Sequence, residues 1–559
     1  MSYTYKNPNK KATSTTAQKP WAPQPERPVA TKSRKEKFLD NMENTRKGWY
    51  SNVKVSPLPM NMTYTENGAV AYKTSGSALV DINYQLTAMR TMPDSEVVKM
   101  FRKAYSENPR LAMRWLFKAA DVREGDGERR LFKVCMTDMM NNGGAEMVAN
   151  LISLMPEFNR WDMLYTFINN KTVYPAIART FRKQWAEDMK NMESGKSISL
   201  MAKWLKSSNS HNPDTRRYGL QTARILNLSE RDYRKALSAM RKHLDVVERK
   251  MSSQNWQSID YETVPSKANL IYNKAFLKND ETRRRTYLDA LTKGDAKINS
   301  NVAYPHEIVH KYCTGSWRGV GAVDATLEGM WKALPNLVKD DSTTLVVADG
   351  SGSMCSSVGG SVTALEVANA LAIYFAERAK GAYHNRYITF SMTPKFVTFK
   401  NGSTLNSKIK TAQQHCEVAN TNISAVFDLI LETAIKTNAP QSDLPKNLLI
   451  ITDGHFDYMV SSGNGHYGHG KVSKTLMQEI AKKYKDAGYT MPNLIFWNVC
   501  GGGRSGSMPL SADERGIMVS GFSVNTLKML MTGKTNPYEV LVETLMDKRY
   551  DIVEETAFQ

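Results

Sequence analysis

Residues 345–353 read LVVADGSGS, and this stretch indicates the fold of the second part of the chain. A run of apolar residues ends in Asp349, and Ser351 and Ser353 follow at alternate positions, separated by glycines. Three structures are compatible with such a pattern: an ordinary strand-to-loop turn, a phosphate-binding loop, or a site for a metal ion. The phosphate loop is excluded because the pattern Gly-x-x-x-x-Gly-Lys-Ser/Thr is missing. A hydrolase nucleophile is also disfavoured, because the stretch around Ser351 reads Asp-Gly-Ser-Gly-Ser rather than Gly-x-Ser-x-Gly.

Further short apolar runs rich in β-branched residues follow in the same part of the chain, namely YITFS, NLLIITD and NLIFWNV. Stretches with helical periodicity lie between them, such as TALEVANALAIYFAERA and ISAVFDLILETAI. Strands that alternate with helices predict an α/β, doubly wound, parallel sheet. In such a sheet the functional crevice lies at the carboxyl ends of the strands, which is where Asp349 is expected.

Small oxygen-bearing side chains are expected to meet at that edge. The run LLIITD ends in Asp453, and NTNIS presents Thr421 just before a helix. A single acid at the end of a strand is usually a helix cap or a turn residue. Several hydroxyls with two carboxylates instead suit a hard octahedral cation. The sequence therefore predicts a site for Mg²⁺, or Mn²⁺, formed by Asp349, Ser351, Ser353, Thr421 and Asp453.

From about residue 75 to residue 312 the pattern is helical almost throughout, with apolar residues at i, i+3 and i+4 spacing. Pro109 is well placed in a first helical turn, and Ser229 begins SERD, a start that resembles a capping box. Many short-linked helices predict a helical-repeat, HEAT-like region, although no strict repeat period is present. Most of the tryptophans at positions 115, 161, 185 and 204 fall at helical apolar positions and are interpreted as core.

The net charge of +20 is unevenly distributed along the 559 residues. Residues 341–559 hold 20 basic and 20 acidic residues, so the whole excess lies in residues 1–340. Such asymmetry favours a polyanionic partner, most often a nucleic acid, over a merely basic soluble surface. Basic residues concentrate in three clusters, the third of which is Arg283, Arg284 and Arg285. The candidate RNA-binding residues come from the first two: Arg123, Arg129, Arg130 and Lys133, and Arg216, Arg217, Arg224, Arg231, Arg234, Lys235, Arg241 and Lys242.

Other features of the composition indicate an intracellular protein. No run approaches the roughly 18–20 apolar residues of a membrane helix, and the first residues lack the apolar core of a secretory signal. The five cysteines are scattered and unlike a zinc site, so reduced thiols are expected. We expect a cytoplasmic protein, in the host cytoplasm if a phage encodes it.

The motifs DGSGS, NTNIS and IITDG, in this order, resemble the von Willebrand factor A domain and its metal-ion-dependent adhesion site. This resemblance implies that Asp349, Ser351 and Ser353 form the first metal loop, Thr421 the second and Asp453 the third. It also implies that the ion keeps an open position for a carboxylate from an acidic protein partner. Sites of this kind bind and do not usually catalyse.

A wider resemblance covers roughly residues 60–555. Its motifs resemble the uncharacterised phage, plant and fungal branch of the TROVE-module, Ro autoantigen-like family: TENGAVAYKTSGSALVD, DVREGDGERRLF, NRWDMLYTFI, SLMAKWLKSSN and YPHEIV. The resemblance implies a helical-repeat ring closed by a von Willebrand A domain. It further implies that single-stranded RNA ends bind in the central hole and that small structured RNA binds on the basic outer face.

Three domains are expected from these observations: a disordered basic arm at 1–55, a TROVE-like helical-repeat RNA-binding domain at 56–340, and a von Willebrand A-like domain at 341–559. The expected function is that of a monomeric, non-enzymatic RNA-binding protein in a ribonucleoprotein. Two alternatives stay open at this point. One is a protein-interaction or virion-associated scaffold, and the other is a Mg²⁺-dependent phosphohydrolase.

Overall fold

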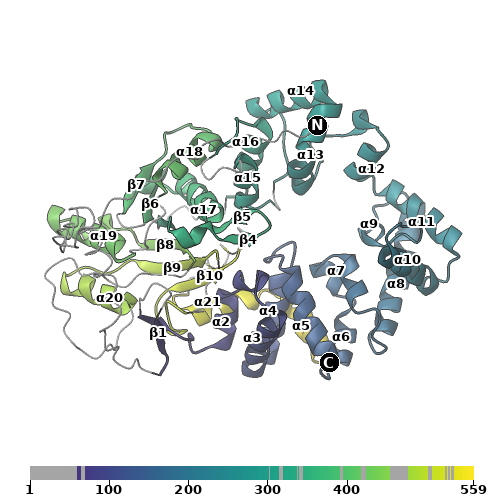
Figure 1. Cartoon of the computed structure of the whole chain (residues 1–559), viewed down its shortest axis with the longest axis horizontal. Coiled ribbons are helices and arrows are strands. Elements are labelled where there is room, and N and C mark those ends of the chain that lie inside the picture. The colour runs from purple at the N-terminus through teal and green to yellow at the C-terminus, as the bar shows by residue number, and fades with distance from the viewer. Residues whose placement is uncertain are drawn as a thin grey trace, which may run out of the picture. The chain divides into compact units, whose positions relative to one another are not determined.

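The computed structural model describes residues 60–559 except 65–69, 301–302, 314–318, 337, 339–343, 391–393, 417–422, 454–475, 501–506, 523–525, 527–528 and 530–533. Residues 58–559 form one compact unit. The basic arm predicted at 1–55 lies outside the described residues. Figure 1 shows the arrangement of the elements.

The part of the chain before residue 333 is mostly helical (Figure 1), preceded by an antiparallel pair of short strands, β1 (Met62–Tyr64) and β2 (Val70–Tyr72). The α-helices are α2 (Ala78–Tyr84), α3 (Asp94–Glu107), α4 (Pro109–Ala120), α5 (Arg129–Asn141), α6 (Ala145–Leu151), α7 (Met155–Phe158), α8 (Tyr174–Glu193), α9 (Met201–Trp204), α10 (Pro213–Ile225), α11 (Glu230–His243), α12 (Val247–Ser252), α13 (Ser266–Asn279), α14 (Glu281–Lys293), α15 (Pro305–Tyr312) and α16 (Ala325–Lys332). Short 3₁₀ turns η1 (Ala88–Arg90), η2 (Trp161–Thr166) and η3 (Trp256–Ser258) connect some of them.

These helices follow the periodicity of their sequences. In α3 the buried residues are Val97, Phe101 and Ala104, which share one face at i, i+4 and i+7 spacing. Helix α4 begins with Pro109 in its first turn, and the Asn108 side chain accepts a hydrogen bond from the Leu111 amide. Ser229 caps α11 in the same way, by accepting from the Asp232 amide at 3.1 Å.

The later part of the chain forms a six-stranded sheet in the order β10-β9-β8-β3-β6-β7. All neighbouring pairs are parallel except β6 and β7 at one edge. The strands of the sheet are β3 (Thr344–Asp349), β6 (Arg386–Phe390), β7 (Lys395–Thr398), β8 (Asn447–Thr452), β9 (Asn493–Asn498) and β10 (Ile517–Ser520). A small hairpin, β4 (Ser357–Gly359) with β5 (Val362–Thr363), follows β3.

The helices of this later part are α17 (Ala364–Arg378), α18 (Leu405–His415), α19 (Ile423–Thr437), α20 (Leu476–Asp486), α21 (Pro537–Leu545) and α22 (Asp551–Ala557), with short 3₁₀ turns η4 (Gly352–Cys355), η5 (Gly381–Tyr383), η6 (Gln441–Asp443) and η8 (Lys548–Tyr550). Strands β3, β8 and β9 are buried at all but their first residue, as expected for parallel strands covered on both faces. Helix α17 is buried nearly all round and packs on β3, β6 and β8. The predicted order, a helical region followed by an α/β sheet, is therefore confirmed.

The helical region contacts the sheet region at both of its ends. Helix α2 packs against β10, and α15 packs against α17. The last helix, α22, returns to pack on α4 and α6. None of the described helices is both long and apolar enough to span a bilayer.

Candidate nucleic-acid and cation sites

Two carboxylates lie together at the carboxyl edge of the sheet. Asp349 is the last residue of β3, and Asp453 directly follows β8. These strands are parallel neighbours, paired in register up to Ala348 and Ile451. The two acids therefore leave adjacent strands at the same edge, and they are only 1% and 5% exposed.

The hydrogen bonds around Asp349 hold it in one orientation. The Ser351 amide donates to its Oδ1 at 2.9 Å, and the Thr452 hydroxyl donates to its Oδ2 at 2.8 Å. Burial, and next the charge of Asp453, raises the pKa of Asp349 to about 7 in spite of these bonds. Two neighbouring buried carboxylates repel each other, and a bound cation would relieve that repulsion.

The donor set at this edge fits a hard divalent cation. The hydroxyls of Ser351 and Ser353 lie 3.0 Å apart beside Asp349, and Ser353 is exposed. Among the described residues, no group of three or more His, Cys, Asp or Glu side chains is placed to hold a metal ion, so the donors at this edge are two carboxylates with hydroxyls. Carboxylates and hydroxyls are ligands that Mg²⁺ and Mn²⁺ prefer. The fifth predicted ligand, Thr421, lies outside the described residues.

The helical region contains a large cavity of about 1910 Å³. We call it the basic cavity, because more basic than acidic side chains line its wall. The basic side chains are Arg90, Arg123, Arg129, Arg160, Arg179, Arg182, Lys183, Lys203 and Lys267. The acidic side chains are Asp126, Glu157, Glu187, Glu248 and Glu307, and the aromatic ones are Trp161, Trp204, Tyr272 and Tyr304.

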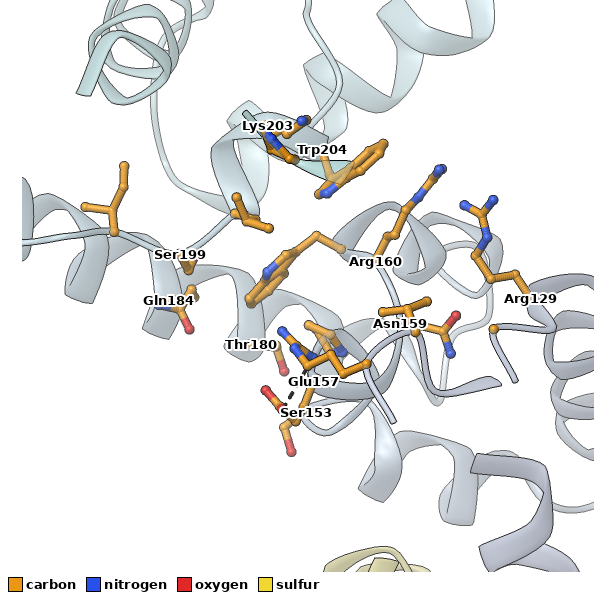
Figure 2. Close-up of a pocket in the computed structure, with 18 of the residues that line it drawn as sticks. Arg129, Ser153, Glu157, Asn159, Arg160, Thr180, Gln184, Ser199, Lys203 and Trp204 are labelled. Carbon is orange, nitrogen blue, oxygen red and sulfur yellow. Dashed lines mark ion pairs between the residues drawn. The ribbon is translucent and has the colours of Figure 1, made fainter. Parts of the chain in front are cut away.

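On one side of the basic cavity, the guanidinium groups of Arg129 and Arg160 lie near the indole ring of Trp204 (Figure 2). The Arg160 guanidinium stacks on the Trp204 ring at 3.9 Å from its centre, and two of its nitrogens donate to the Asp162 carboxylate. Figure 2 shows Arg160 between Trp204 and Arg129. Burial and then the like charge of Arg160 lower the pKa of Arg129. This arrangement of cations favours an anion between or beside them.

Part of the positive charge in this wall is not neutralised by the protein. Lys203 pairs with Glu248 at 3.3 Å, and Arg123 pairs with Glu157 at 3.3 Å. Four other cations have no carboxylate partner among the residues that the structure describes: Arg129, Arg179, Arg182 and Lys183. These groups remain available to pair with phosphates.

The first predicted cluster of RNA-binding residues divides between the cavity and the packing of the helices. Arg123 and Arg129 line the basic cavity. Arg130 instead donates to backbone carbonyls around η1, including that of Met92 at 2.7 Å, and pairs with Asp94. Lys133 is exposed on α5.

The second predicted cluster lies on α10 and α11. Arg216, Arg217 and Arg224 line a separate, smaller pocket of about 510 Å³. The exposed face of α11 carries Arg231, Arg234, Lys235 and Lys242. Arg241 is turned inward, where it donates to the carbonyls of Ala202 and Leu205 and to the Ser207 hydroxyl.

Several cavity residues were not predicted from the sequence. These are Arg90, Arg160, Arg179, Arg182, Lys183, Lys203, Lys267, Trp204, Tyr272 and Tyr304. The stretch RTFRK at 179–183 carries a signal, because its cations share one face of α8 at i, i+3 and i+4 spacing. Trp115, Trp161 and Trp185 are buried as predicted, whereas Trp204 is only half-buried and faces the cavity.

Comparisons with known proteins identify relatives without assigning an activity. Residues 343–556 match the model of a domain of unknown function (DUF7788), and residues 65–162 and 206–344 match another domain of unknown function (DUF2828). A solved structure, the crystal structure of Deinococcus radiodurans RO (RSR) protein, aligns with 75% of this chain and 93% of its own at 13% identity. Its TM-score of 0.32 is too low to assign a shared fold.

A protein of Acanthamoeba polyphaga mimivirus, named uncharacterized protein L728, is 31% identical to this chain over 87% of each protein. The similarity thus covers both the helical region and the sheet. The chain belongs to the same protein family as this mimivirus protein.

Proposed function

We propose that this protein is an RNA-binding protein that holds single-stranded RNA in the basic cavity and does not act as an enzyme. The observation that carries the proposal is the convergence of nine basic and four aromatic side chains on one cavity of about 1910 Å³. The TROVE-like motifs in the sequence support it independently, because NRWDMLYTFI and YPHEIV contribute Arg160 and Tyr304 to that same wall.

The chemistry of this wall suits a single strand better than a duplex. Unpaired guanidinium and ammonium groups attract the phosphates. Planar groups such as the Trp204 ring offer surfaces on which unstacked bases pack, and duplex bases already stack on each other. Trp204 and three cations without a carboxylate partner in the described part of the chain, Arg129, Arg179 and Lys183, line the same cavity, so groups for both kinds of contact occur on one wall.

The sheet region has a separate role in this proposal. We propose that Asp349, Ser351, Ser353, Thr421 and Asp453 hold Mg²⁺ or Mn²⁺, as in the von Willebrand A domains that the sequence resembles. The cation would neutralise the two buried carboxylates and present an acceptor position to an acidic partner. Closure of the helices into a ring, binding of small structured RNA on the exposed face of α11, and a cytoplasmic location belong to the same proposal.

The test compares two basic surfaces of the same chain. Binding of a fluorescein-labelled single-stranded RNA decamer is measured by anisotropy over a range of salt concentrations. The cavity variant is Arg129→Ala with Arg160→Ala, and the matched outer-face variant is Arg231→Ala with Arg234→Ala and Lys235→Ala. We expect the cavity variant to bind about ten-fold or more weakly, with a salt slope reduced by roughly 0.7 for each lost phosphate contact.

The outer-face variant is expected to bind the decamer almost as tightly as the parent. If only the outer-face variant lost affinity for the RNA, the RNA site would be on α11 and not in the cavity. Failure of the parent to bind any RNA at moderate salt would overturn the proposal and favour the scaffold alternative.

A further inference from the structure

Helix α2, from the helical region, lies across the same edge of the sheet that carries the two acids. Asn498, the last residue of β9, donates from its side chain to the carbonyl of Tyr84 at 3.0 Å. The Thr87 amide donates to the hydroxyl of Ser520, the last residue of β10, at 3.2 Å, and the two hydroxyls lie 3.0 Å apart. The segment 84–87 is therefore attached to the carboxyl ends of two adjacent strands.

The next strand along this edge is β8, which leads into Asp453. Tyr84, whose carbonyl accepts a hydrogen bond from the end of the neighbouring strand β9, is only 1% exposed. The charge of Asp453 contributes, after burial, to a raised pKa of the Tyr84 phenol. The phenol of Tyr84 thus lies within electrostatic range of Asp453, although it belongs to the helical region.

The Tyr84 hydroxyl has no hydrogen-bond partner within the described part of the chain. Buried hydroxyls are nearly always paired, because an unpaired one loses its hydrogen bonds to water without replacement. Tyr387 on β6 also has a fully buried and unpaired hydroxyl, but no carboxylate influences it. What distinguishes Tyr84 is therefore that its backbone is bonded to the end of β9, the strand beside β8, and that the charge of Asp453 acts on its phenol.

We propose that Tyr84 belongs to the outer shell of the cation held at Asp349, Ser351, Ser353 and Asp453, where its hydroxyl accepts a hydrogen bond from a metal-bound water. Mg²⁺ usually keeps several of its waters, and these waters are strong hydrogen-bond donors. This inference rests on the cation site proposed above. Its consequence is that the cation ties α2, and with it the start of the helical region, to the sheet.

The experiment uses the full chain and MgCl₂ as the probe. Calorimetric titration measures Mg²⁺ affinity, and hydrogen exchange measures protection of the amides at 78–84 with and without Mg²⁺. Tyr84→Phe removes one oxygen and keeps the ring that packs in the core. We expect this variant to bind Mg²⁺ about ten-fold more weakly, as is common for outer-shell partners, and to lose most of the Mg²⁺-dependent protection of α2.

Two further variants separate the possible outcomes. Tyr387→Phe removes an equally buried, unpaired hydroxyl from the same sheet and should keep the affinity of the parent. Asp349→Asn should abolish binding. If the parent binds no Mg²⁺, the cation site itself is overturned. If the parent binds, Asp349→Asn does not, and Tyr84→Phe matches the parent in affinity and protection, then the role of Tyr84 alone is wrong.

Discussion

At the scale of single residues, the cations in and near the basic cavity differ in whether they stabilise the fold. Lys118 and Asp126 form an ion pair at 2.7 Å with 5% and 1% of their side chains exposed. Arg129 is exposed in the wall of the basic cavity, has no ion-pair partner among the described residues, and experiences the like charge of Arg160. The Lys118–Asp126 pair is buried, whereas Arg129 feels the like charge of Arg160 against the opposite charges of Asp162 and Glu128.

Replacing Arg129 by Ala should therefore weaken RNA binding without weakening the fold. We expect the free energy of unfolding to change by less than about 1 kcal/mol, because an unpaired, exposed cation contributes little. Affinity for single-stranded RNA should fall in the same variant. Urea unfolding and anisotropy measure the two quantities, and a marked loss of stability would show that Arg129 is structural.

In contrast to Arg129→Ala, Lys118→Ala should lower the free energy of unfolding. It leaves the Asp126 carboxylate buried without its partner, which typically costs about 3–5 kcal/mol. A Lys118→Ala variant as stable as the parent would contradict this interpretation of the cavity wall.

At the scale of elements, α11 combines a packed face with a cationic face. Tyr233, Leu237 and Met240 are buried at i, i+4 and i+7 spacing. The cations of the helix lie on the remaining surface, except Arg241, whose guanidinium caps backbone carbonyls of the segment before α10. The start of the helix depends on Ser229, whose hydroxyl accepts from the Asp232 amide.

Ser229→Ala should lower the free energy of unfolding by about 1 kcal/mol, the usual effect of losing a helix cap. Chemical denaturation followed by circular dichroism measures this change. Ser238→Ala is the matched control, since Ser238 is exposed in the middle of the same helix. If both substitutions have the same effect, the cap does not stabilise α11.

At the scale of the whole molecule, the last helix of the sheet region is held against the helical region. Helix α22 packs on α4 and α6, and Glu554 accepts hydrogen bonds at 2.6 Å from both Arg110 and Arg114 of α4. Nearby, Arg549 pairs with the fully buried Asp121 at the end of α4. The last residues of the sheet region therefore complete the packing of the first helices.

Glu554→Gln should lower the free energy of unfolding at pH 7 by about 1.5–3 kcal/mol, the range for hydrogen bonds to charged groups. The two arginines lower the pKa of Glu554 from its ordinary 4.5. Its contribution is therefore present above pH 4.5 and is lost as the pH falls through the lowered value in the folded protein.

Urea unfolding at pH 7 and at pH 3 checks this prediction, because the difference between parent and variant should shrink at the lower pH. Glu555→Gln, on the exposed side of the same helix, should behave like the parent at both values. A difference that persists unchanged at pH 3 would show that the carboxylate charge is not responsible.

The sequence by itself predicted helices, four strands of the sheet and its acidic edge, but not the antiparallel edge strand β7 or the strand β10. Periodic apolar residues predicted the helices, and short β-branched runs predicted β3, β6, β8 and β9, because both signals are local. The rule that parallel strands end at one edge was enough to bring Asp349 and Asp453 together. The confinement of the excess charge to residues 1–340 likewise follows from the amino-acid sequence alone.

Only the tertiary structure decided which cations share a surface and which side chains approach the acidic pair. Arg129, Arg160 and Trp204 come from three separate segments, and their common position depends on how those segments pack. Tyr84 lies far from Asp453 along the chain, and nothing in its local pattern distinguishes it from a core tyrosine. Contacts of this kind follow from long-range packing, which no local periodicity encodes.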